Sequence, residues 1–165
     1  MPISFGVERS VRRANLKLVG TNIAESIPGS ERPRSAFLLS DLSRVLIVDD
    51  QSDATRVLAM LLNRSGYEAR ALNDSRQALQ AVRDFKPHVM LLDIAMPYMN
   101  GYEVARRIRR ESGFEDLPII AVTAFGHEEH QKRAQEAGIQ HRLVKPCSFF
   151  ELKALIAQVL SAPSR

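Results

Sequence analysis

Five side chains that can take part in chemistry stand at the ends of short apolar segments. Asp49 and Asp50 follow "VLIV", Asp93 follows "VMLL", Thr123 follows "IIAV", and Lys145 follows "RLV". Two adjacent carboxylates at the end of a buried segment repel each other and resist desolvation. Their position therefore calls for an explanation in binding or catalysis as well as in packing.

The three aspartates would form one acidic site if their segments lie side by side. Three carboxylates cannot all remain ionised together without a cation. A hard divalent ion fits oxygen ligands, and Mg²⁺ suits a site that keeps waters and receives a phosphoryl group. No histidine or cysteine stands at these segment ends, which argues against zinc.

The remaining two residues suit the same chemistry. The ammonium group of Lys145 and the hydroxyl group of Thr123 can both bind phosphoryl oxygens. A carboxylate beside a cation, a lysine and a hydroxyl is equipped to attack phosphorus and to carry an aspartyl phosphate. Singly, each residue has a structural alternative: an aspartate can cap a helix, a threonine can bond locally, and Lys-Pro is typical of a turn. The five together favour a functional site.

From Arg44 onward, the elements that must position these residues alternate between strands and helices. The predicted strands are 44–48, 67–72, 88–93, 118–123 and 141–145, and the predicted helices are 52–66, 74–85, 100–112, 127–138 and 148–160. Strict alternation predicts an α/β fold, with a parallel sheet covered by helices on both faces. Functional groups in such sheets gather beyond the carboxyl ends of the strands. In the first helix, the spacing of Val57, Met60 and Leu61 predicts an apolar face.

Composition limits the compartment and the partners. The chain has 165 residues, is 45% hydrophobic and 25% charged, and contains a single cysteine, Cys147. No disulfide framework is expected, and the cytoplasm is the default location. No apolar run approaches the roughly 18 residues of a membrane span. The net charge of +4 is scattered and aromatic residues are few, so direct DNA binding is not expected.

The chain divides into three predicted regions. Residues 1–42 contain prolines and glycines without sustained periodicity, which predicts a basic, largely flexible N-terminal extension. Residues 43–162 hold all the strand and helix patterns and are long enough to form one domain. Residues 163–165 form a short C-terminal tail.

These residues resemble the receiver domain of two-component response regulators. The resemblance rests on "VLIVDDQ" (45–51), "VMLLDIAMPYMNGYEVARRIR" (89–109), "IIAVTAFG" (119–126) and "HRLVKP" (141–146), and it covers about 44–162. It implies a doubly wound, flavodoxin-like, five-stranded parallel sheet in the order 2-1-3-4-5. Strands one and three would then be neighbours, which would bring the three aspartates together.

The resemblance also implies roles for single residues. Asp93 would accept a phosphoryl group from a phosphohistidine on a histidine kinase or a histidine phosphotransfer protein. Lys145 would hold the phosphoryl group, and Thr123 would move to donate a hydrogen bond to it. The implied cofactor is Mg²⁺, with Mn²⁺ as the alternative. Its implied ligands are Asp50 directly, Asp49 mostly through a water, Asp93, and the backbone carbonyl of Ala95.

One position departs from the family pattern. Many receivers have an aromatic residue or a histidine three positions before the lysine, and that side chain swings inward when the threonine moves. Arg142 stands there in this chain. Its long side chain favours a guanidinium that stays in solvent, so the usual coupling to Thr123 is not expected to carry over unchanged.

The sequence also predicts how the signal leaves the molecule. No effector module follows the last predicted helix, so the expected output is a switch in the surface around the fourth and fifth helices, bound by a downstream protein. The expected protein is a cytoplasmic phospho-acceptor, a monomer or weak dimer, and not an enzyme. Alternatives are the receiver module of a hybrid kinase and a non-phosphorylated receiver-like interaction domain. A phosphohydrolase is disfavoured, because Ala95 replaces the second acid or base and no insertion could form a lid.

Overall fold

The computed structural model describes residues 42–124 and 128–162. Its elements alternate along the chain as β1 (Arg44–Val48), α1 (Ser52–Arg64), β2 (Glu68–Leu72), η2 (Ser75–Gln77), α2 (Ala78–Phe85), β3 (Val89–Leu92), α3 (Gly101–Arg109), β4 (Ile119–Thr123), α4 (Glu128–Glu136), β5 (His141–Val144) and α5 (Phe149–Ser161). By its contacts the chain separates into residues 1–36 and residues 37–165, and the second unit contains all of these elements. The predicted tail 163–165, and all but the last residue of the predicted extension, lie outside the described residues.

The five strands form one parallel sheet in the order β2-β1-β3-β4-β5, as predicted. Val48, the last residue of β1, pairs with Leu92, the last residue of β3. The chain segments that follow these two strands therefore begin side by side at the same edge of the sheet. This pairing is what places Asp49 near Asp93, although 44 positions separate them in the sequence.

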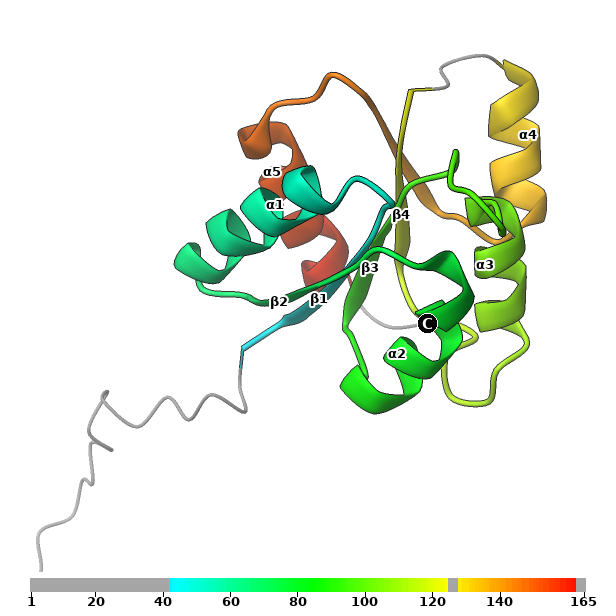
Figure 1. Cartoon of the computed structure of the whole chain (residues 1–165), viewed down its shortest axis with the longest axis horizontal. Coiled ribbons are helices and arrows are strands. Elements are labelled where there is room, and N and C mark those ends of the chain that lie inside the picture. Colours follow the sequence, from blue (N-terminus) through cyan, green and yellow to red (C-terminus); the bar gives the residue numbers. More distant parts are fainter. Residues whose placement is uncertain (1–41, 125–127, 163–165) are drawn as a thin grey trace, which may run out of the picture. The chain divides into compact units, whose positions relative to one another are not determined.

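Helices cover both faces of the sheet, with α2, α3 and α4 on one side and α1 and α5 on the other (Figure 1). The central strands are apolar on both faces because each face meets a helical layer. In β1, Leu46 and Val48 pack toward α2 and α3, while Val45 and Ile47 pack toward α1 and α5. Among the described residues, no helix has the length and hydropathy needed to cross a membrane.

The apolar face predicted for α1 is wrong for Val57 and Met60, while the third predicted residue, Leu61, is half-buried. Val57 and Met60 are 52% and 47% exposed, whereas Leu62 is fully buried and Leu58 packs against the core. The reason is that residues 57–62 form an unbroken apolar run, so their spacing does not select one face. Packing against the sheet makes the choice, and it leaves an apolar strip of α1 uncovered.

Polar side chains define where the helices nearest the strand ends begin. The side chain of Asn100 accepts a hydrogen bond from the backbone N–H of Glu103 and caps α3. Ser148 and Glu151 form a reciprocal capping box at the start of α5. Both caps fix the direction in which a helix leaves the loop that follows a site residue, Asp93 in one case and Lys145 in the other.

Candidate functional site

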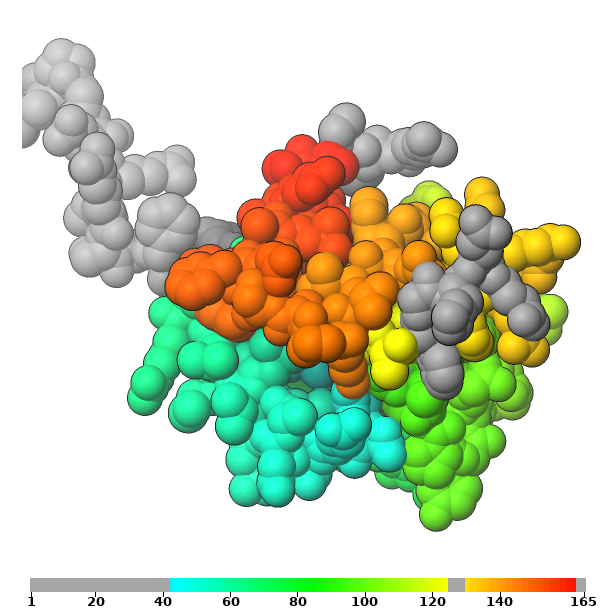
Figure 2. All heavy atoms as spheres, turned by 90° about the horizontal axis from the view of Figure 1, so that it is seen from above, coloured from blue at the N-terminus to red at the C-terminus, as the bar shows by residue number. Residues whose placement is uncertain are grey.

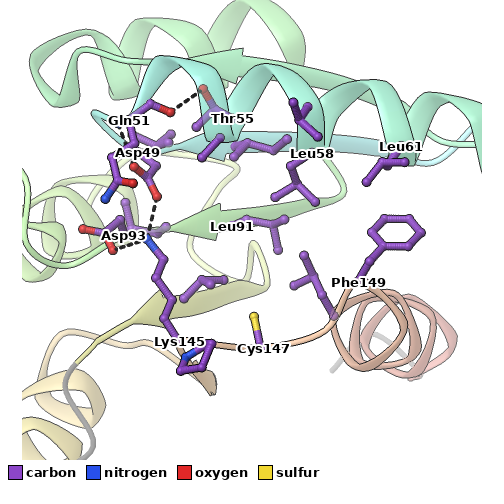
Figure 3. Close-up of a pocket in the computed structure, with 18 of the residues that line it drawn as sticks. Asp49, Gln51, Thr55, Leu58, Leu61, Leu91, Asp93, Lys145, Cys147 and Phe149 are labelled. Carbon is purple, nitrogen blue, oxygen red and sulfur yellow. Dashed lines mark hydrogen bonds and ion pairs between the residues drawn. The ribbon is translucent and has the colours of Figure 1, made fainter.

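Asp49, Asp93 and Lys145 meet beyond the carboxyl ends of β1, β3 and β5 (Figure 3). The Lys145 Nζ lies 2.7 Å from Asp49 Oδ2 and 3.0 Å from Asp93 Oδ1. The two aspartates are 9% and 7% exposed. Two nearly buried carboxylates are costly unless a positive charge offsets them, and the ammonium group between them provides that charge.

Backbone amides hold the other oxygens of the two aspartates. Asp49 Oδ1 accepts a hydrogen bond of 2.9 Å from the N–H of Gln51, and Asp93 Oδ2 accepts one of 2.7 Å from the N–H of Ala95. Each aspartate thus bonds to the backbone two residues further on, a local turn that fixes its side chain. The site is preorganised by contacts that the loops themselves supply.

Lys145 stays positively charged in this environment. Partial burial lowers the pKa of its ammonium group, but the hydrogen bonds and charges of Asp49 and Asp93 outweigh that effect, so the net pKa is raised above its usual value. A charged lysine between two carboxylates is a ready counter-charge for further negative groups that enter the site.

Thr123 lies where the sequence predicted, at the end of β4 and next to Lys145. Its carbonyl accepts a hydrogen bond of 2.9 Å from the N–H of Lys145, and the residue is 1% exposed. Figure 2 shows the face of the molecule on which the parts of the chain near the ends of β1 (cyan), β3 (green), β4 (yellow) and β5 (orange) come together. Four of the five predicted side chains, those of Asp49, Asp93, Thr123 and Lys145, therefore belong to this one edge.

The structure brings two of the three predicted carboxylates to Lys145, and the metal-ligand role predicted for Asp50 stays a prediction. Asp50 is exposed, and no group of three or more metal-ligating side chains forms within residues 42–124 and 128–162. Successive side chains leaving a strand diverge, so Asp50 does not join Asp49 at Lys145. Ala95 contributes its N–H to Asp93, and the predicted role of its carbonyl stays a prediction.

The oxygen ligands that the site offers still suit a hard divalent cation. Asp49 and Asp93 offer carboxylate oxygens at the edge of the sheet, and the exposed Asp50 adjoins them. Oxygen-only sets of this kind suit Mg²⁺ or Mn²⁺ rather than zinc. Each bonded carboxylate oxygen also retains a second lone pair as acceptor capacity.

Sequence reasoning missed two polar residues that position Asp49. Asn73, just after β2, donates from Nδ2 to the carbonyl of Asp49 at 2.7 Å and to Thr55 Oγ1 at 2.8 Å. Thr55 lies in the first turn of α1 and is 2% exposed. The sequence did contain an indication of both residues. An asparagine follows one predicted strand, and a threonine lies in the first turn of an otherwise apolar helix. Both positions lie at the edge of the sheet that holds the site.

Replacing Asn73 should therefore destabilise the edge. Asn73→Ala removes two hydrogen bonds and should lower the free energy of unfolding by about 1–3 kcal/mol in urea titration. Asn73→Asp should cost more than alanine, because a carboxylate would face the Asp49 carbonyl oxygen, another acceptor. Equal stability of both variants and the wild type would contradict this role.

An apolar groove runs from the site between α1 and α5, with a volume of about 680 Å³. Asp49, Asp93 and Lys145 line its polar end, and Leu58, Leu61, Cys147, Phe149 and Leu152 are among the residues that line the rest (Figure 3). Burial raises the pKa of the Cys147 thiol, so this side chain contributes as an apolar wall. Phe150, next along α5, is 82% exposed, and of the two phenylalanines only Phe149 packs against the core.

In this doubly wound sheet, backbone amides and a lysine fix two aspartates at one edge. That combination of fold and site is typical of a class of signalling domain, and comparison with known proteins identifies the same class. Residues 45–157 match the model of the response regulator receiver domain. The chain is 37% identical over 116 residues to the phosphate regulon transcriptional regulatory protein PhoB of Pseudomonas aeruginosa, covering 70% of this chain and 51% of PhoB. It is 39% identical over 117 residues to the probable transcriptional regulator ycf27 of Galdieria sulphuraria, covering 71% and 45%.

Solved structures show the same fold. The chemotaxis protein CheY4 of Vibrio cholerae superposes with a TM-score of 0.69 at 28% identity, covering 72% of this chain and 98% of CheY4. The receiver domain of a sensor histidine kinase of Pseudomonas aeruginosa PAO1, described with a magnesium ion in its active-site cleft, gives 0.68 at 26% identity, covering 73% and 99%. The chain belongs to the response regulator receiver family of two-component signalling. It spans about half the length of the curated relatives named above.

Proposed function

We propose that this chain is a phospho-acceptor whose acceptor group is the carboxylate of Asp93. The observation that carries the proposal is the environment of that carboxylate. It is 7% exposed at the end of a central strand, with one oxygen bonded to the Lys145 ammonium and the other to the Ala95 N–H. Such a group is oriented and charge-compensated, and it lies at the mouth of a groove.

The proposed step is an in-line displacement at phosphorus. A carboxylate oxygen of Asp93 forms the new P–O bond while the P–N bond of a phosphohistidine breaks, and the imidazole leaves with the bonding electron pair and takes a proton. Lys145 then offsets the charge of the phosphoryl oxygens, and the hydroxyl of Thr123 donates a hydrogen bond to them. Asp49, Asp50, Asp93 and the Ala95 carbonyl would hold Mg²⁺ or Mn²⁺, whose charge further offsets that of the phosphoryl group.

The phosphoryl donor is a histidine kinase or a histidine phosphotransfer protein. The groove between α1 and α5 supports this, because it is apolar along its length and ends at Asp93. Val57 lines this groove, and Phe150 is a further exposed apolar side chain at the start of α5. A donor helix laid along this surface would bring its histidine to the acceptor without a large movement of either protein.

The remaining assignments follow from this role. The chain acts as a cytoplasmic signalling protein, monomeric or weakly dimeric, that catalyses only its own phosphorylation and dephosphorylation. The phosphoryl group switches the surface around α4 and α5, which a downstream protein binds. The likeness to the receiver of a sensor histidine kinase favours one further candidate, the receiver module of a hybrid kinase. A non-phosphorylated interaction domain is the second alternative.

Incubation with acetyl phosphate and Mg²⁺, followed by intact mass measurement, tests the proposal. We expect a gain of one phosphoryl group in the wild type and none in Asp93→Asn, a substitution that keeps the shape and removes the nucleophilic charge. No adduct on the wild type would instead support the interaction domain. Rapid turnover of varied phosphate esters would support a phosphohydrolase.

A further inference from the structure

A second cleft of about 680 Å³ lies between α4 and β5, on the opposite face of the sheet from the α1–α5 groove. Its polar lining consists of Arg109, Gln131, Gln135, Gln140, His141 and Arg142. Three of these side chains can carry a positive charge, and no aspartate or glutamate lines the cleft in the part of the chain that the structure describes. The cleft is therefore complementary to a negatively charged ligand.

Arg142 lies on the α4 side of β5. Its neighbour Leu143 packs with the core under α1 and α5, and side chains alternate along a strand. Arg142 pairs with Ala121, which belongs to the core on the α4 side. The expectation that its guanidinium stays in solvent is wrong in part, because the residue is half-buried and its Nη1 is buried without a hydrogen-bond partner among the described residues. The small residues Ala134 and Gly138 line the same cleft.

The neighbouring Arg109 differs, because its donors are already used. Its Nε and Nη2 donate to the carbonyl of Gly138 at 3.0 and 2.7 Å, and Nη1 donates to the carbonyl of Phe114 at 3.3 Å. Nη2 also bonds to Gln140 Oε1 at 2.9 Å. Arg109 therefore supports the wall of the cleft, while Arg142 retains an unsatisfied donor, which is unfavourable unless an acceptor arrives.

We propose that the α4–β5 cleft binds a carboxylate-bearing, acidic segment of a downstream protein, with Arg142 as its anchor. The half-buried side chain would turn so that its unsatisfied Nη1 pairs with a partner carboxylate in a charge-assisted contact. Gln131, Gln135 and Gln140 add amide groups that can bond to a peptide backbone, and Ile139 adds an apolar contact. No aromatic residue lines the cleft, which favours a peptide over a nucleic acid, whose bases stack on aromatic rings. The inference rests on the proposed output through a protein partner and names its chemistry.

The test titrates the isotopically labelled full chain with a short amphipathic peptide rich in glutamate and with the same peptide carrying glutamine instead. Amide and arginine side-chain NMR signals report where each binds, for the wild type, Arg142→Gln and Arg106→Gln. Arg106, exposed on α3, is the matched control because it loses the same charge outside the cleft. Phosphoryl uptake from acetyl phosphate is measured for all three proteins first. Its absence would refute the proposed function itself, independently of this inference.

The glutamate peptide should shift the signals of Arg142 and the cleft residues. Its affinity should fall about tenfold in Arg142→Gln and stay unchanged in Arg106→Gln, and the glutamine peptide should bind weakly to all. Undiminished binding to Arg142→Gln, or no binding by the wild type, would overturn the proposal. Tighter binding of a DNA duplex at Arg142 would point to a nucleic acid instead. Concentration-dependent cleft shifts without peptide would point to a second copy of the chain.

Discussion

Replacing Gly101 by alanine should lower the free energy of unfolding by about 3 kcal/mol. A Cβ at this position would overlap the carbonyl oxygen of Asp93 and lie 2.9 Å from both the Cα and the Cδ1 of Ile94. The Gly101 N–H also donates to the Ile94 carbonyl at 3.0 Å, which closes the loop between β3 and α3. The clash is with backbone, which cannot move away without displacing Asp93. Urea unfolding measures the loss.

Gly113→Ala is the control for this experiment. Gly113 has a φ of +86° but nothing within 4 Å of the added Cβ. Gly113→Ala should therefore lower the free energy of unfolding only by the backbone strain, about 1–2 kcal/mol. The folded fraction of Gly101→Ala should also take up the phosphoryl group more slowly, since the acceptor carboxylate would be displaced. Stability of Gly101→Ala within about 0.5 kcal/mol of the wild type would show that the loop is not packed as described.

Replacing Lys145 by glutamine should slow phosphoryl uptake from acetyl phosphate about a hundredfold, in line with the loss of one electrostatic donor from a preorganised site. Lys145 contacts both Asp49 and Asp93, and it would face the phosphoryl oxygens as the P–O bond forms. The initial rate of mass gain measures the effect. Lys132→Gln, which removes an exposed lysine on α4, should leave that rate unchanged. Equal rates for both variants would remove Lys145 from the proposed mechanism.

The same substitution gives a pH prediction. The pKa of Lys145 is raised on folding above its ordinary value of 10.5, because its bonds to Asp49 and Asp93 outweigh its desolvation. A group with a raised pKa stabilises the fold below the unfolded pKa and ceases to do so as the pH passes the folded pKa. The difference in free energy of unfolding between the wild type and Lys145→Gln should therefore stay constant up to about pH 10.5 and become smaller above it. A gap that widened in alkali would contradict this.

The sheet and most of its site could be predicted from the sequence because apolar strands lead directly into polar residues. A run such as "VMLL" fits a strand buried on both faces, so the position of Asp93 follows from the end of the run. The same logic placed Asp49, Thr123 and Lys145 at one edge once the strand order was known. These positions depend on the backbone path, which the hydrophobic pattern largely determines.

Side-chain direction was less predictable. Asp49 and Asp50 are adjacent in the sequence, yet only Asp49 reaches Lys145. Arg142 has several rotatable bonds, and no pattern in the sequence indicates that its Nη1 lies buried. Asn73 was missed because its two hydrogen bonds cross from β2 to β1 and α1, and such long-range contacts leave no local periodicity.

The proposed function requires that Asp93, and no other residue, carries the phosphoryl group. The most direct test treats the chain with acetyl phosphate and Mg²⁺, reduces the acyl phosphate with borohydride, and maps the resulting homoserine by tandem mass spectrometry. We expect conversion at position 93 alone, and none when Mg²⁺ is chelated. Homoserine at position 49 or 50 instead, or an unmodified Asp93 after full incubation, would contradict it.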